Sequence, residues 1–130
     1  MAEKKTITTE TAQGQFDAWL ERIGKETADL SLQQQEEAEK IIRRIEKGQI
    51  TFTDDGKITY HLKFPVDTTE KLEFKSRIKV SQSARFSGKE DDLFKSCKVI
   101  ESYTGVPATI IKELDMTDFL RVAGIIGFFG

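Results

Sequence analysis

The chain has 130 residues, of which 38% are hydrophobic and 32% are charged, and its formal net charge is −2. This apolar share suits the core of one ordinary domain, and it is too low for a membrane protein and too high for a disordered chain. The nearly balanced charge excludes a strongly basic or strongly acidic tail. The single cysteine, Cys97, and the single histidine, His61, leave almost no room for a disulfide, a zinc site or a Ser–His–Asp triad.

We expect neither a secretion signal nor a membrane-spanning segment. Its first ten residues lack an apolar core. The longest run of apolar residues and glycine, 123–130, is far shorter than the roughly 20 residues that a bilayer requires. Together with an unpaired thiol, these features lead us to expect a cytoplasmic protein that does not enter the membrane.

Residues 1–48 are predicted to form two amphipathic helices, which we interpret as an N-terminal helical extension. Apolar residues at helical spacing predict the first helix from about Thr11 to Ile23, where Gly24 ends it. The second helix follows Ser31, a typical N-cap residue. Its apolar stripe consists of Ala38, Ile41, Ile42 and Ile45.

From Gln49 the apolar spacing changes to two, which predicts a three-stranded antiparallel meander. The turn is expected at Asp54–Gly56, and Pro65 is expected to end the second strand. In this register one face is buried and contains Tyr60, Phe64 and Phe74. The opposite face carries basic side chains, namely Lys57, His61, Lys63, Lys71, Lys75, Arg77 and Lys79.

The strip formed by Lys63, Lys75, Arg77 and Lys79 is a possible basic face of the sheet. Basic strips can bind phosphate, so one alternative function is that of a small regulatory or nucleic-acid-binding protein. Sheets that bind nucleic acid usually also expose aromatic side chains, whereas the predicted register buries them. A solvated face is therefore the better interpretation, and we do not expect a nucleic-acid partner.

After residue 88 the helical spacing returns, and the chain as a whole is predicted to be an α+β fold. One helix ends at Gly105, a short helical turn follows Pro107, and a last helix is capped by Asp115. Asp118 would lie near the positive N-terminal end of that helix, where an acid is stabilising. We expect residues 49–130, the meander and the C-terminal helices, to pack as one domain.

The last helix is apolar on nearly its whole circumference, so more than one side of it must be covered. Leaving both Phe128 and Phe129 in water would forfeit roughly 1.5–3 kcal/mol for each ring. Either these residues pack back onto the sheet or they contact another chain, and the sequence leaves both open. As a hypothesis we assign partner contact, with another protein or a second copy, to Phe119, Val122, Ile126, Phe128 and Phe129.

The remaining candidate residues favour structural roles. Cys97 lies on an apolar helical face and is interpreted as a core residue, and His61 as a surface side chain. The acids at 90–92 fall in a first helical turn and are better explained by the helix dipole than by a metal. We therefore predict no metal site, no cofactor and no enzymatic activity.

Two short segments and the end of the chain resemble a known family. These are TGVP (104–107), LDMTDFL (114–120) and the closing Gly127-Phe128-Phe129, all following a predicted hairpin. In this order they resemble the small tail assembly chaperones of Mu-like and P2-like contractile-tailed bacteriophages, over about residues 49–130. The resemblance implies a non-enzymatic protein of the bacterial host cytoplasm. It would bind the tape-measure protein, keep its apolar helices soluble and help to recruit tail-tube subunits.

Overall fold

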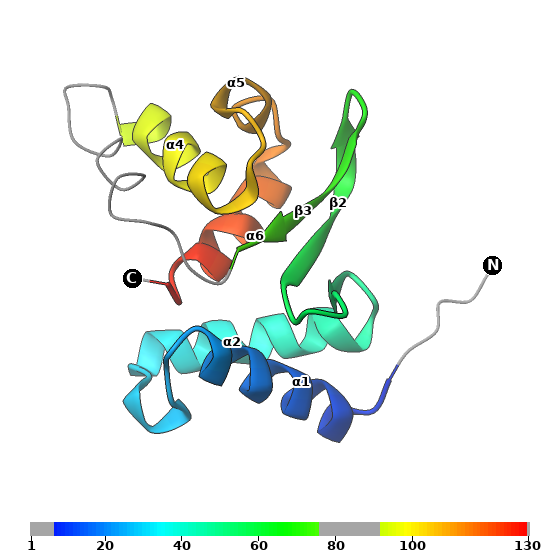
Figure 1. Ribbon diagram of the computed structural model, residues 1–130, viewed down its shortest axis with the longest axis vertical. Coiled ribbons are helices and arrows are strands. Elements are labelled where there is room, and N and C mark those ends of the chain that lie inside the picture. The colour runs from blue at the N-terminus through cyan, green and yellow to red at the C-terminus, as the bar shows by residue number, and fades with distance from the viewer. Residues whose placement is uncertain (1–6, 76–91, 130) are drawn as a thin grey trace.

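The computed structural model describes residues 7–75 and 92–129, and its architecture is α+β, as predicted (Figure 1). Two helices come first, then a three-stranded sheet, then three helices. A short 3-10 helix, η1, joins the first two helices. The elements in chain order are α1 (Thr9–Arg22), η1 (Thr27–Asp29), α2 (Leu32–Glu46), β1 (Ile50–Phe52), β2 (Ile58–Val66), β3 (Thr69–Phe74), α4 (Asp92–Thr104), α5 (Ala108–Ile111) and α6 (Met116–Ile126).

Local side-chain caps set the N-terminal ends of the first two helices. The Thr8 side chain accepts a hydrogen bond from the Thr11 N–H at the start of α1. At the start of α2, Ser31 and Gln34 form a capping box, in which each side chain accepts from the other residue's backbone N–H. The predicted Ser31 cap is therefore confirmed, and α1 begins two residues before the predicted Thr11.

The sheet has the strand order β1-β2-β3, and both pairings are antiparallel, which confirms the predicted meander. The first turn closes as predicted, with the Thr53 N–H donating to the Lys57 carbonyl at 2.9 Å. Gly56 adopts a φ of +88°, which favours glycine. A Cβ at this position would also lie 2.3 Å from Arg22 Nε, so the hairpin tip packs closely against the end of α1.

The second strand departs from the predicted register at its far end. β2 continues through Pro65 to Val66, with an irregularity in its pairing with β3 between His61 and Val66. At this point the alternation of faces breaks, and Phe64 is 47% exposed. The predictions that Pro65 ends the strand and that Phe64 is buried are therefore wrong, whereas Tyr60 and Phe74 are fully buried as expected. Arg77 and Lys79 lie outside the described residues.

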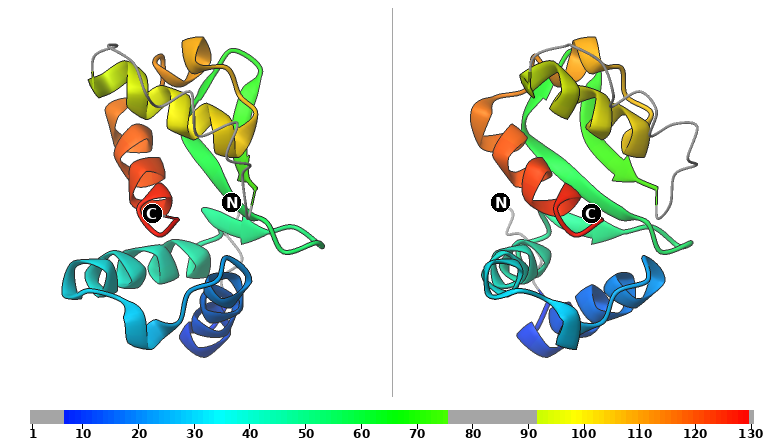
Figure 2. Two further views of the ribbon diagram at one scale, coloured as in Figure 1. Left: turned by 60° about the vertical axis from the view of Figure 1, so that its left-hand side comes forward. Right: turned by 90° about the vertical axis from the view of Figure 1, so that its left-hand side faces the viewer.

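Helices α4 and α6 cover one face of the sheet, and the α1–α2 pair lies at one end of it (Figures 1 and 2). In both views of Figure 2 the C-terminal end of α6 is directed toward that pair. One hydrophobic cluster runs through all of these layers, from Phe16 and Ile41 through Tyr60 to Ile100 and Val122. The described part of the N-terminal extension therefore shares its core with the sheet and the C-terminal helices.

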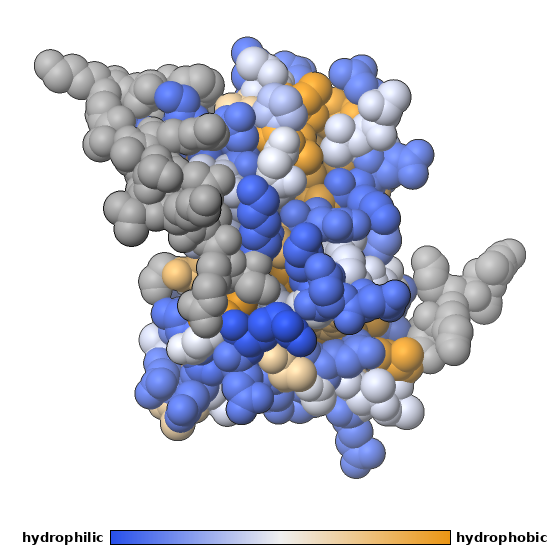
Figure 3. All heavy atoms as spheres, viewed as in Figure 1, coloured by the Kyte–Doolittle hydropathy of each residue, from blue (hydrophilic) through white to orange (hydrophobic). Residues whose placement is uncertain are grey.

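The face drawn in Figure 3 is mostly hydrophilic, with apolar atoms visible between polar side chains in its upper half. Within residues 7–75 and 92–129, no helix combines the length and the apolar composition that crossing a bilayer requires.

Candidate functional site

Three of the predicted partner residues, Phe119, Val122 and Ile126, lie on helix α6, and Phe128 and Phe129 follow it. The start of the helix is fixed by a local cap. The Asp115 side chain accepts a hydrogen bond from the Thr117 N–H at 2.8 Å, which confirms the predicted N-cap. From there, three residues at helical spacing, Asp118, Val122 and Ile125, are completely buried. These residues define the inner face of α6, which packs toward β2.

Asp118 attaches α6 to the irregular part of β2. Its carboxylate accepts hydrogen bonds from the Tyr60 hydroxyl at 2.6 Å, the Lys63 N–H at 3.0 Å and the Phe64 N–H at 2.9 Å. Consecutive N–H groups of a regular strand point to opposite sides, so two of them can reach one carboxylate only where the strand is irregular. This contact accounts for the break in alternation that leaves Phe64 exposed.

The position of the Asp118 carboxylate also controls the chemistry of Tyr60. Burial, together with the hydrogen bond to Asp118, raises the pKa of Tyr60 to about 12. The phenol therefore keeps its proton to a higher pH than an ordinary tyrosine and remains a donor to the carboxylate. Arg121 Nη1 lies 3.5 Å from the Tyr60 oxygen, so a positive charge from α6 also faces this buried pair.

An aromatic cluster connects the end of α6 to the N-terminal helices. Phe128 packs edge-on against Phe16 and Trp19, with ring centroids 5.5 Å and 6.1 Å apart. Phe129 contacts Trp19 at 5.6 Å and Tyr103 of α4 at 4.2 Å. The chain terminus therefore lies between α1 and α4 and joins two parts of the core that are far apart in the sequence.

These contacts change the assignment of the predicted partner residues. Val122 and Phe128 are 0% and 1% exposed, so they are core residues and not partner-contact residues of the folded chain. Phe129 is partly buried in the aromatic cluster. The sequence left open whether the terminal phenylalanines pack onto the sheet or contact another chain. Phe128 does pack within the chain, but against Phe16 and Trp19 of α1 and not onto the sheet as the first interpretation expected.

The outer face of α6 is apolar and largely uncovered among the described residues. Met116 and Leu120 expose 65% and 61% of their surface, and Ala123 is also exposed. Phe119 and Ile126 are partly buried at the edge of the same face. Among the residues whose side chains the structure describes, the other exposed large apolar side chains are Leu32, at 74%, and Phe64, at 47%.

A shallow groove between α4 and α6 continues this outer face. Its volume is about 170 Å³, and its lining is mainly apolar. Phe119 and Ile126, two of the predicted partner residues, lie in this groove. The other lining residues are Ser96, Val99, Ile100 and Ala123.

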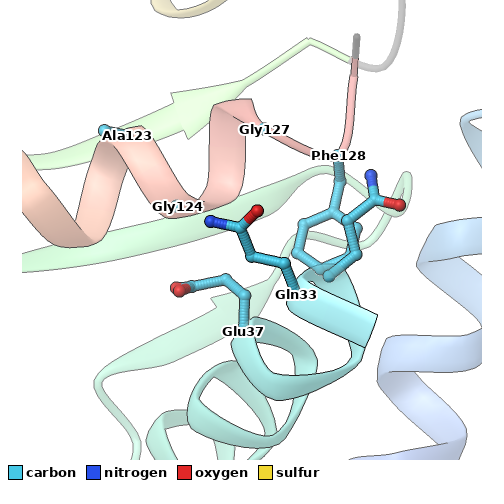
Figure 4. Close-up of a pocket in the computed structure, with 7 residues that line it drawn as sticks. Gln33, Glu37, Ala123, Gly124, Gly127 and Phe128 are labelled. Carbon is cyan, nitrogen blue, oxygen red and sulfur yellow. The ribbon is translucent and has the colours of Figure 1, made fainter. Parts of the chain in front are cut away.

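A second, larger cleft of about 320 Å³ lies on the opposite side of α6, between α6 and α2 (Figure 4). Its α6 wall is formed by Ala123, Gly124 and Gly127, and Phe128 also lines it. Its α2 wall is polar and consists of Gln33, Gln34 and Glu37. Ala123 lines both the cleft and the groove, so the two hollows adjoin across α6.

The predicted basic face is only partly represented among the described residues. Lys63 and Lys75 are exposed, and the Lys63 ammonium lies 5.7 Å from the centre of the exposed Phe64 ring. Lys71 faces the carboxylate of Glu73 at 3.6 Å, so acids interrupt the strip. Thr59, between the basic positions, is 2% exposed.

The two residues considered for chemistry occupy ordinary positions. Cys97 is completely buried, as predicted. His61 is half-buried rather than a free surface side chain, and its Nε2 lies 2.8 Å from Thr51 Oγ1. Burial and the nearby Lys71 lower the pKa of His61. Within the described residues, no group of three or more His, Cys, Asp and Glu side chains is placed to hold a metal ion.

Sequence reasoning placed the candidate partner residues on and after α6 but did not identify which face of the helix is exposed. It missed Met116 and Leu120, and it gave Asp118 a role at the helix terminus although this residue is buried. The apolar spacing offered no signal for this orientation, because the apolar residues of α6 cover nearly its whole circumference. Comparison of the chain with known protein families, curated proteins and solved structures finds no match.

Proposed function

We propose that this protein is a non-enzymatic assembly factor that holds an apolar helix of another protein on the outer face of α6. The observation that carries the proposal is the pair Met116 and Leu120, which expose 65% and 61% of their surface beside the α4–α6 groove. An amphipathic helix laid into such a groove buries apolar side chains at helical spacing on both partners. Contiguous exposed apolar surface of this kind typically marks an interaction site.

The size of the surface suits a reversible contact. Helix α6 has 11 residues, which corresponds to about 16 Å of helix. Burying Met116 and Leu120 would contribute at most roughly 1.5–3 kcal/mol each, which by itself does not exceed the roughly 4–15 kcal/mol that association costs in lost freedom. The contact therefore also needs the apolar lining of the groove, and it is weak. A helix held this way is released readily, as an assembly factor requires.

The resemblance over residues 49–130 suggests which assembly this would be. In the tail assembly chaperones of contractile-tailed bacteriophages, the client is the tape-measure protein, and tail-tube subunits are recruited to it. We propose the same partners for this chain, in the cytoplasm of a bacterial host. Protection of apolar client helices before assembly is consistent with an apolar groove on an otherwise charged exterior.

The experiment compares two substitutions at similarly exposed leucines. Leu120→Glu places a charge on the outer face of α6, and Leu32→Glu places one at the start of α2, where Leu32 is 74% exposed. Both variants should fold, because exposed substitutions usually change stability by less than about 0.5 kcal/mol. Co-purification with the tape-measure protein should be lost for Leu120→Glu and retained for Leu32→Glu. Full binding by Leu120→Glu would overturn the proposal.

A second copy of the chain is the competing occupant of this face. Light scattering distinguishes a second copy of the chain from a client helix as the occupant. If the wild-type protein is a dimer that becomes monomeric in Leu120→Glu, the face is a homo-oligomer interface and not a client site.

A further inference from the structure

The cleft between α2 and α6 is lined by one acidic side chain. Among the described residues that line it, Glu37 is the charged one, and the others are Gln33, Gln34, Ala123, Gly124, Gly127 and Phe128. In Figure 4, Gln33 and Glu37 rise from α2 toward the turn of α6 that carries Gly124. A negative group therefore lies in a hollow whose remaining walls are amide, methyl and aromatic.

The position of the Glu37 carboxylate depends on the absence of a side chain at Gly124. A Cβ built at Gly124 would lie 2.2 Å from Glu37 Oε2, so any larger residue would displace the carboxylate. The glycine interrupts a helix at a cost of about 1 kcal/mol relative to alanine. The Glu37 carboxylate therefore occupies the space that a side chain at position 124 would fill.

The internal partner of Glu37 leaves its hydrogen-bonding capacity largely unused. Arg44 Nη1 lies 3.8 Å from Glu37 Oε2, which is beyond hydrogen-bond length. Burial and the neighbouring Arg121 lower the pKa of Arg44, so this guanidinium is already in an unfavourable environment for charge. A carboxylate has two oxygens and accepts several hydrogen bonds, so Glu37 can take a further donor from the open side of the cleft.

The cleft adjoins the proposed helix-binding groove, because Ala123 lines both. A helix seated on the outer face of α6 passes over Ala123, and a long side chain from its edge reaches the cleft. Lysine and arginine suit this path, since their methylene stems cover apolar surface while the charged ends reach a polar group. Ala123 and the glycine-bearing turn supply the apolar surface, and Glu37 supplies the opposite charge.

We propose that the α2–α6 cleft receives a basic side chain of the bound helix, so that the client is an amphipathic helix with a lysine or arginine beside its apolar stripe. This inference rests on the proposed function. A second copy that presented its own α6 would offer one basic residue, Arg121, which faces Tyr60 at 3.5 Å, so we favour another protein over a self-paired α6 as the source of the side chain.

The test uses synthetic amphipathic helical peptides with a common leucine–alanine stripe. Members of the panel carry either lysine or glutamine at positions flanking the stripe, and binding is measured by fluorescence anisotropy. The best lysine peptide should bind wild-type protein about 10-fold more tightly than its glutamine counterpart, and high salt should reduce the difference. The preference should disappear in Glu37→Gln and persist in Glu36→Gln, an exposed position on the same helix.

The Gly124→Ala variant is an independent test, because it keeps Glu37 but changes the position of its carboxylate. Alanine favours the helix, so the variant should remain folded, while its Cβ displaces the carboxylate and weakens the lysine preference. Equal binding of lysine and glutamine peptides to wild type, or a preference that survives Glu37→Gln, would overturn the inference and leave the proposed function standing. If no peptide of the panel binds the wild-type protein, the proposed function fails and the inference falls with it.

Discussion

Replacing Asp118 with asparagine removes the acceptor that holds α6 on β2 while preserving the size of the side chain. The carboxylate accepts three hydrogen bonds, from the Tyr60 hydroxyl and the Lys63 and Phe64 N–H groups. In asparagine one oxygen becomes an NH₂ group, so one of the three donors faces another donor. An unsatisfied buried donor costs about 1–3 kcal/mol, and each remaining bond loses roughly 1 kcal/mol when its acceptor is no longer charged.

Neutralising a buried carboxylate also removes its desolvation cost, which offsets part of this loss. We therefore expect Asp118→Asn to lower the free energy of unfolding by about 2–4 kcal/mol. That is a large part of the total of about 5–15 kcal/mol typical of a domain.

Urea unfolding followed by the fluorescence of the one tryptophan, the buried Trp19, measures the effect. The control is Asp115→Asn, which keeps an N-cap acceptor at the exposed start of the same helix and should change stability by less than about 0.5 kcal/mol. If Asp118→Asn also changes the free energy of unfolding by less than about 0.5 kcal/mol, the reasoning is refuted, because the buried carboxylate then contributes no net stability.

The other predictions concern the chain terminus and the pH dependence of stability. Phe128→Ala should cost about 3–5 kcal/mol and shift the Trp19 emission, whereas a cost below about 1 kcal/mol would mean that the terminus frays and does not pack. Because the pKa of His61 is lowered from 6.5, the unfolded chain binds its proton more readily, and stability should fall as the pH decreases below about 6.5. His61→Asn should flatten that part of the pH–stability curve, and an unchanged slope would contradict the assignment. Because the pKa of Tyr60 is raised from 10.0 to about 12, stability should fall as the pH rises between these values, and Tyr60→Phe should show a smaller fall.

The packing of the terminus also determines how the partner site can be tested. From the sequence alone, removing everything after Leu120 is a natural way to delete a partner-binding tail. In the structure such a truncation would remove Val122, Ile125 and Phe128 from the core. The protein should then unfold, and loss of binding would carry no information about the site. Single substitutions on the outer face of α6 avoid this problem.

The sequence by itself determined the elements whose signals lie within a few residues of one another. The Ser31 cap, the glycine of the first hairpin, the helix stop at Gly105 and the Asp115 cap all operate over one turn of chain, and each is found where it was predicted. Apolar spacing over 10 to 15 residues likewise separated the helices from the strands and predicted the α+β order.

Only the tertiary structure decided which face is buried at the far end of β2 and on α6. Asp118 reaches Tyr60, Lys63 and Phe64 across 58, 55 and 54 positions of sequence, and this contact turns Phe64 outward. It also directs one side of α6 inward and leaves Met116 and Leu120 outside. A helix that is apolar on every side contains no local signal of its orientation, because spacing identifies an inner face only when the other side is polar. The orientation of α6 depends on where the Asp118 carboxylate meets its hydrogen-bond donors on β2. The spacing of apolar residues in the sequence does not specify those positions.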